Sequence, residues 1–163
     1  MDAATDDHTT YMRLAIAEAE NAGLRGDLAV GSVLVLDGEV IGAGANAATT
    51  RDDFTAHAEI EVLRGLSDDR LAAGLENATL YTTFEPCPMC MGAIFYSRIG
   101  TVVIGGHRPT GDQRWGGYSP QQFAALVAPS GFSPVVIDGP LEDECRVARE
   151  TTSPTAKQWK VTR

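Results

Sequence analysis

The stretch that decides the fold is ATLYTTFEPCPMCMGAIFYSRIGTVVIG, residues 78–105. It begins with a short β-rich run, 78–83, and ends with a second one, 101–105. Residues 88–97 between them are typical of a short helix that begins at a proline, where a missing N–H costs least. Alternating strands and helices predict an α/β domain.

The flanking sequence continues this alternation. Residues 29–36 and 40–46 are β-rich runs separated by Asp37-Gly38-Glu39, and an Asp-Gly pair between apolar runs is a strong hairpin signal. Further elements are expected as helices at 9–22, 56–66, 119–127 and 141–149, a strand at 135–137 and a long loop at 106–118. We therefore predict an α/β fold, a three-layer α/β/α sandwich around a mixed five-stranded sheet.

The composition is that of a soluble globular protein. Of the 163 residues, 44% are hydrophobic and 21% are charged, and no apolar run approaches the roughly 20 residues of a membrane span. The first ten residues are acidic and polar, unlike a signal or transit peptide. We expect a single domain over 1–163 with its core at about 9–149, a weakly ordered tail at 150–163, and a cytoplasmic location without membrane contact.

The charge argues against a nucleic-acid partner. The formal net charge is −9, whereas proteins that bind a phosphate backbone do so with Lys and Arg. The chain also has no long basic run.

Two short motifs carry the chemistry, His57-Ala58-Glu59 and Pro86-Cys87-Pro88-Met89-Cys90. Zinc binds imidazole nitrogen and thiolate sulfur, and catalytic zinc sites use three protein ligands and one water. His57, Cys87 and Cys90 supply that number, and the two cysteines share one face at the start of a helix. We predict a Zn²⁺ site made by these three residues. Cys145, in a helical segment, is expected to be a packed hydrophobe.

Glu59 is the predicted general acid and base. It lies two residues after His57, so its carboxylate can reach a water on the metal without being a ligand. Zinc lowers the pKa of such a water to about 7, and a carboxylate beside it can carry a proton to the leaving amine. Either motif alone is a weak signal, but together they indicate a catalytic zinc site.

The sequence resembles a known family well beyond these motifs. The similar stretches are VGSVLVLDGEVIGAGAN (30–46), TAHAEIEVLR (55–64), residues 80–106 and DEC (143–145). They resemble the cytidine deaminase-like superfamily, in the branch of tRNA adenosine deaminases, guanine deaminases and fungal-type cytosine deaminases. The resemblance covers about residues 10–148. It implies a three-layer α/β/α fold, bound Zn²⁺, a homodimer, and hydrolysis of the C–N bond of a cyclic amidine with release of ammonia.

The resemblance also assigns roles to residues. The metal ligands and Glu59 match the zinc ligands and proton shuttle of the family. Asn46 matches an asparagine that contacts the substrate, and Phe84 and Glu85 match the pocket wall and the backbone on the ammonia side. Trp115, in the loop 106–118, is interpreted either as a lid residue that stacks on a base or as part of a connector that seals the core or the dimer.

Guanine-acting members of the family place an acidic side chain against the base. Asp112, Glu142 and Glu144 are the candidates for that role in this sequence. An acid at the start of a helix is more often a cap.

The charge and the tail favour a small substrate. The tRNA-acting branch ends in an aromatic and basic helix, whereas residues 146–163 here are interrupted by Pro154 and poor in aromatics. We therefore predict a hydrolytic deaminase of a free nucleobase or base-like ring of the guanine, cytosine or aminotriazine type, without a nucleic-acid partner. The alternatives are a tRNA adenosine-to-inosine deaminase and an inactive zinc-binding module, although Glu59 argues against the latter.

Overall fold

The computed structural model describes residues 3–152, with the side chains of 3–6 and 73 left out of the description. Most of the tail expected at 150–163 therefore lies outside the described residues. The helices are α1 (Ala3–Arg25), α2 (Ala58–Arg64), α3 (Asp68–Ala73), α4 (Pro88–Tyr96), α5 (Pro120–Val127) and α6 (Glu142–Thr152), with a short 3₁₀ helix η1 (Ala128–Ser130). The strands are β1 (Gly31–Leu36), β2 (Glu39–Ala45), β3 (Thr79–Thr82), β4 (Thr101–Ile104) and β5 (Val135–Asp138).

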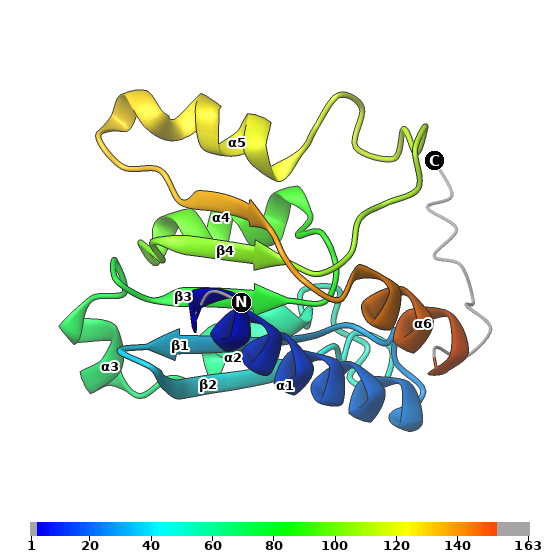
Figure 1. Cartoon of the computed structure of the whole chain (residues 1–163). Coiled ribbons are helices and arrows are strands. Elements are labelled where there is room, and N and C mark those ends of the chain that lie inside the picture. The colour runs from blue at the N-terminus through cyan, green and yellow to red at the C-terminus, as the bar shows by residue number, and fades with distance from the viewer. Residues whose placement is uncertain (1–2, 153–163) are drawn as a thin grey trace.

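The five strands form one mixed sheet in the order β2-β1-β3-β4-β5 (Figure 1). Strand β1 is antiparallel to both of its neighbours, β2 and β3. Strands β3, β4 and β5 run parallel to one another. Parallel neighbours need a crossover connection, which α4 supplies between β3 and β4, and α5 between β4 and β5. The predicted mixed five-stranded sheet is confirmed.

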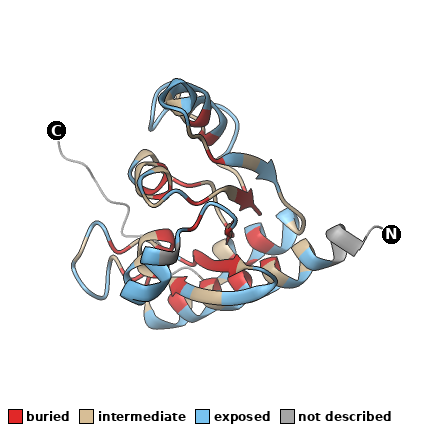
Figure 2. Cartoon of the chain, turned by 90° about the vertical axis from the view of Figure 1, so that its left-hand side faces the viewer, coloured by how far each residue is buried: buried red, intermediate tan, exposed pale blue. Residues whose placement is uncertain are grey.

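Helices cover both faces of the sheet, so the predicted three layers are confirmed. On one face, α1 and α6 pack through a buried cluster that includes Met12, Ala15 and Cys145. On the other face, α2, α4 and α5 pack through a larger cluster that includes Val62, Met91 and Ile94. Figure 2 shows the buried residues gathered along the strands and on the helix sides that face them. Among the described residues, no helix is long and apolar enough to cross a membrane.

The hairpin forms as the Asp-Gly signal predicts. Asp37 and Gly38 both have positive φ values, 52° and 80°, and Leu36 pairs directly with Glu39 across the turn. Two residues in this conformation match the right-handed twist of the flanking strands.

The helix bounds differ from the prediction in several places: α2 is shorter than the expected 56–66, and α6 continues to Thr152, past the expected end at 149. Helix α1 extends beyond both ends of the expected 9–22. Helix α3 was not expected, because its sequence DDRLAA has no apolar period. The feature of the sequence that indicates this helix is Ser67 at its N-cap. The Ser67 side chain accepts a hydrogen bond from the Arg70 backbone N–H.

Helix α2 lies unusually close to strand β2 because of Gly44. A Cβ atom at this position would lie 2.3 Å from the Ala58 carbonyl oxygen and 2.6 Å from the Val62 backbone nitrogen. Both atoms belong to the backbone of α2, so a side chain could fit only if the helix moved. The residue before this helix is His57. The missing side chain of Gly44 therefore sets how deeply the start of α2 sits on the sheet.

Gly44→Ala should lower the free energy of unfolding by about 3 kcal/mol or more, at the upper end of what overpacking costs, because the new methyl group meets backbone atoms. Gly92→Ala is the control, since a Cβ there meets no atom within 4 Å and an alanine suits its helix. Urea unfolding of both variants measures the difference. Equal stability of the two variants would contradict the close approach.

Candidate active site

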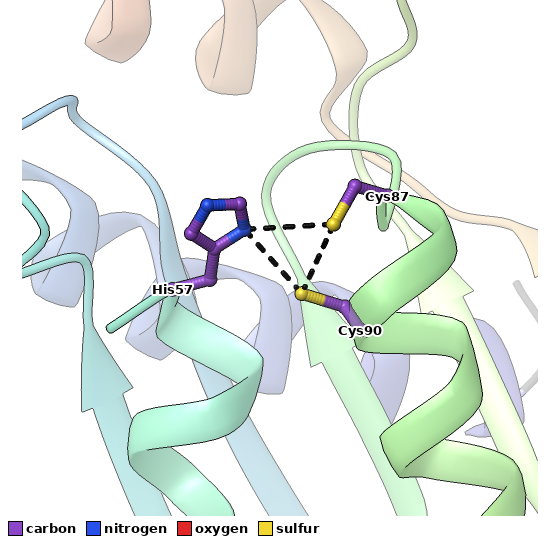
Figure 3. Close-up of side chains that lie close together, drawn as sticks. All are labelled: His57, Cys87 and Cys90. Carbon is purple, nitrogen blue, oxygen red and sulfur yellow. Dashed lines mark hydrogen bonds between the residues drawn. The ribbon is translucent and has the colours of Figure 1, made fainter. Parts of the chain in front are cut away.

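The topology of the sheet brings two helix starts together. Because β2 and β3 are both antiparallel to β1, they run in the same direction and end at the same edge of the sheet. Helix α2 begins beyond the end of β2, and helix α4 begins beyond the end of β3. Figure 3 shows the result, with His57 at the start of α2 facing Cys87 and Cys90 at the start of α4.

His57 and Cys87 are the N-cap residues of these two helices. Both have extended backbones, with ψ values of 156° and 170°, and neither side chain caps its own helix by a hydrogen bond. Cys90 lies in the first turn of α4. The sequence predicted His57 and the two cysteines within the first turns of their helices. In the structure, His57 and Cys87 lie one residue before the first turn. Their side chains therefore project from the sheet edge toward the gap between the helices.

The three ligand atoms form a compact triangle. His57 Nδ1 lies 3.6 Å from Cys87 Sγ and 3.5 Å from Cys90 Sγ, and the two sulfur atoms are 3.6 Å apart. Bonds of about 2.3 Å to sulfur and about 2.1 Å to nitrogen at tetrahedral angles place ligand atoms about 3.6–3.8 Å apart. The triangle therefore fits three corners of a tetrahedral zinc site.

The three ligand side chains also shift one another's pKa values. The hydrogen bond between the two sulfurs, together with His57, lowers the pKa of Cys87 to about 4 although burial opposes this. The same hydrogen bond and burial raise the pKa of Cys90, and the hydrogen bond to Cys87 raises that of His57. Three close groups thus share their protons as one unit. Zinc ligation needs thiolates and a neutral imidazole nitrogen, so it would replace these shared protons.

Within residues 3–152, the group that could hold a metal ion contains three side chains and no fourth. Cys145 does not join it. This residue is 2% exposed and packs with Met12 on the opposite face of the sheet, as expected for a packed hydrophobe. Three protein ligands are the number typical of catalytic zinc sites, in which the remaining position stays open.

Glu59 lies next to the triangle but outside it. The residue is 3% exposed, and its Oε2 lies 3.5 Å from Cys90 Sγ. Burial raises the pKa of the Glu59 carboxyl above its ordinary value. A carboxyl group that lies beside the metal ligands and holds its proton more tightly than an exposed one suits a general acid and base.

Thr82 is a contact of this site that sequence reasoning missed. It is fully buried at the end of β3. Its hydroxyl lies 3.4 Å from Glu59 Oε1 and 3.2 Å from the Phe84 carbonyl oxygen, both of which can accept its proton. A polar residue on the buried end of a strand was the available signal, because buried hydroxyls need partners.

Asn46, an expected substrate residue, is buried near the segment that leads into His57. Asn46 is 5% exposed, and its Oδ1 accepts a hydrogen bond from the Ala48 N–H at 3.2 Å. The next residue, Ala47, donates its N–H to the Ala56 carbonyl at 2.9 Å. This contact places Asn46 close to the chain segment that leads into His57. Its role toward substrate stays a prediction.

Phe84 and Glu85 lie in the turn between β3 and α4. The Arg149 guanidinium carbon, from α6, lies 4.0 Å from the centre of the Phe84 ring. The Glu85 side chain is 9% exposed and is paired with Arg108 and with His107. Sequence reasoning did not find Arg108 or Arg149, because nothing in the local pattern indicates these long-range partners.

Trp115 and the three candidate acids lie outside the metal triangle. Trp115 is 41% exposed. Asp112 accepts a hydrogen bond from the Arg114 backbone N–H, and Glu142 and Glu144 lie in the first turn of α6. Glu144 is also 3.6 Å from Arg13. Contact of Trp115 or of any of these acids with substrate stays a prediction.

Known proteins are similar to this chain in sequence and in fold. The family model described as the cytidine and deoxycytidylate deaminase zinc-binding region matches residues 5–106, more than half of the chain. A tRNA-specific adenosine deaminase of Bacillus subtilis is 39% identical over 137 residues, which span 83% of this chain and 81% of that protein. A solved structure from a study of A-to-I editing by tRNA:A34 deaminases has a TM-score of 0.71 and 38% identity. The match covers 86% of this chain and 99% of that one.

A guanine deaminase of Bacillus subtilis is also similar. It is 43% identical over 94 residues, which span 56% of this chain and 59% of that protein. The shared segment is therefore shorter than that with the tRNA-specific relative.

The purified chain should contain one zinc ion, and Cys90→Ser should lose it on dialysis because one corner of the triangle is removed. Cys145→Ser is the matched control and should keep its zinc, since this thiol lies on the other face of the sheet. Elemental analysis of the dialysed proteins gives the answer. Retention of a full zinc content by Cys90→Ser would contradict the assignment of this ligand.

Proposed function

The chain belongs to the family of zinc-dependent cytidine and deoxycytidylate deaminases, and we propose that it hydrolyses the exocyclic amine of adenosine in a tRNA anticodon. The observation that carries this proposal is the arrangement of His57, Cys87 and Cys90 beside the buried Glu59. The choice of substrate is supported by tRNA-specific adenosine deaminases that resemble this chain over most of their length.

The residues at the site suit hydrolytic deamination. Zinc, when bound, supplies a Lewis acid that makes water nucleophilic at neutral pH. Glu59 lies on the Cys90 side of the ligand triangle. From there its carboxylate can take one proton from the attacking water and pass it to the ring nitrogen, and then take the proton of the new hydroxyl group and pass it to the leaving amine. Thr82 holds the other carboxyl oxygen, which limits the directions in which Glu59 can point.

Support for a tRNA substrate comes from the share of each relative's length that this chain matches. The tRNA-specific protein of Bacillus subtilis is covered over 81% of its length, and the chain from the tRNA:A34 deaminase study over 99%. The guanine deaminase of Bacillus subtilis is covered over 59% of its length in sequence and over 71% in structure. The free-base substrate predicted from charge and tail is therefore not confirmed, and the tRNA alternative is supported better.

One local feature also suits a phosphate-bearing substrate. Arg149 is half-buried, and its guanidinium carbon lies over the Phe84 ring. Burial lowers the pKa of its guanidinium; the nearby Glu150 opposes this shift, Arg114 adds to it, and Asp112 opposes it. Arg149 thus places one cation at the Phe84 ring, with both Arg114 and the acids Glu150 and Asp112 near it, and a local cation can attract an anion even in a chain whose net charge is −9.

The second candidate is deamination of a free nucleobase. It is favoured by the net charge of −9, which opposes binding of a polyanion, and by the 43% identity to a guanine deaminase. In this case Trp115 and Asn46 would contact the ring. An inactive zinc-binding module is disfavoured by the buried Glu59. A homodimer and a cytoplasmic location stay part of the proposal.

Glu59→Gln should keep zinc and fold but lower the deamination rate at least about 10²–10⁴-fold, the usual contribution of general acid–base catalysis. Glu61→Gln is the matched control from the same helix, because its carboxylate pairs with Arg51 and Arg64 instead of facing the sulfurs. Zinc content and ammonia release are measured for both. A Glu59→Gln rate near that of Glu61→Gln would show that another residue moves the protons.

The substrate is tested with an anticodon stem-loop that carries adenosine at the wobble position. Its kcat/KM should exceed that for guanine, cytosine, aminotriazines and free adenosine, and should fall as salt rises, because phosphate contacts are screened. The same stem-loop with guanosine at that position is the control. If any free ring is deaminated faster than the stem-loop, the free-base candidate replaces the tRNA proposal.

A further inference from the structure

The loop 106–118 is tied to the turn that carries Cys87. This turn comprises residues 83–87, between β3 and α4. The Glu85 backbone N–H donates to the Gly106 carbonyl oxygen at 2.8 Å. Side chains further along the loop return to the same turn at two more points.

The first point is a buried ion pair between Arg108 and Glu85. Arg108 Nε and Nη2 lie 3.0 and 2.8 Å from Glu85 Oε1, and the two side chains are 12% and 9% exposed. Arg108 Nη2 also donates to the Tyr118 carbonyl oxygen at 2.9 Å. Because a guanidinium is planar and its donors have fixed directions, these bonds hold both ends of the loop against the turn.

The second point is the Tyr118 hydroxyl, which donates to the Pro86 carbonyl oxygen at 2.7 Å. The ring of Tyr118 also lies 5.7 Å from the Arg108 guanidinium carbon. The Pro86 carbonyl belongs to the planar peptide group that leads into Cys87. Its hydrogen bond therefore restrains the peptide plane from which the Cys87 side chain projects.

The start of the loop has an anchor that does not involve Tyr118. His107 lies 3.5 Å from Glu85 Oε2 and 3.3 Å from Asp138 Oδ1, at the end of β5. Removal of the Tyr118 hydroxyl therefore leaves the ion pair and this second anchor in place. The hydroxyl can be tested without releasing the whole loop.

We propose that Glu85, Arg108 and Tyr118, together the loop clamp, position Cys87 as a metal ligand. A ligand already held in its bound orientation loses less conformational freedom when the metal binds, and contacts behind the ligands commonly change metal affinity by about 10–100-fold. The clamp side chains act through the backbone before Cys87, so they are positioning residues. The proposal concerns metal retention and goes beyond the proposed function, since it holds for any substrate.

Tyr118→Phe tests the clamp, with Tyr11→Phe as its matched control. Each change removes one tyrosine hydroxyl and one hydrogen bond to a backbone carbonyl, because Tyr11 donates to the Gly38 carbonyl at 2.8 Å in the distant hairpin. Transfer of zinc from the loaded full chain to a chromogenic chelator should be about tenfold faster in Tyr118→Phe. It should be unchanged in Tyr11→Phe. Thermal melting of the same samples reports stability.

Equal zinc-release rates in Tyr118→Phe, Tyr11→Phe and the unchanged chain would overturn the proposal. A contact that only stabilises the loop lowers the melting temperature without changing zinc release far below it. Arg108→Lys is a second variant, which keeps a positive charge opposite Glu85 but loses the planar set of donors. It should also release zinc faster, and an unchanged rate would remove the ion pair from the clamp.

Discussion

The site depends on the position of β1 between β2 and β3, antiparallel to both. This pairing makes β2 and β3 end at one edge of the sheet, so the helices that follow them start side by side. If either strand ran the other way, His57 and the two cysteines would lie at opposite edges. The depth of α2 on the sheet is set in turn by Gly44, where backbone meets backbone. The metal triangle is therefore a consequence of strand order and of one missing side chain.

The residues at this edge of the sheet differ in how deeply they are buried, and this difference matches their roles. His57 and Cys87 are only partly buried, so the ligand triangle stays open to one side, where a substrate can approach. Glu59 and Thr82 are buried between the sheet and the helices. There the carboxyl group keeps a raised pKa and has few directions in which to point. A proton carrier needs both properties, because its pKa must lie near the working pH and its oxygen must stay within reach of the reacting atoms.

The net charge and the relatives point to different substrates, and the reason is physical. Net charge is a sum over the whole surface, whereas binding of a phosphate depends on the few cations near the site and on screening over about 10 Å. Arg149 lies against the Phe84 ring, with Arg114, Glu150 and Asp112 near it, while other acids lie elsewhere, among them those that open α3. A sequence total of −9 could not reveal this separation. The net charge was therefore weak evidence for a free-base substrate.

The sequence by itself determined what depends on local chemistry. Residue types and spacing indicated the zinc ligands and Glu59, the Asp-Gly pair predicted the hairpin, and alternating runs predicted five strands in three layers. Only the tertiary structure decided which distant groups meet: Thr82 with Glu59, Arg149 with Phe84, and the loop clamp with the turn before Cys87. Arg108 and Glu85 are 23 residues apart in the chain. Their contact depends on β3 and β4 lying side by side, and no local pattern in the sequence encodes it.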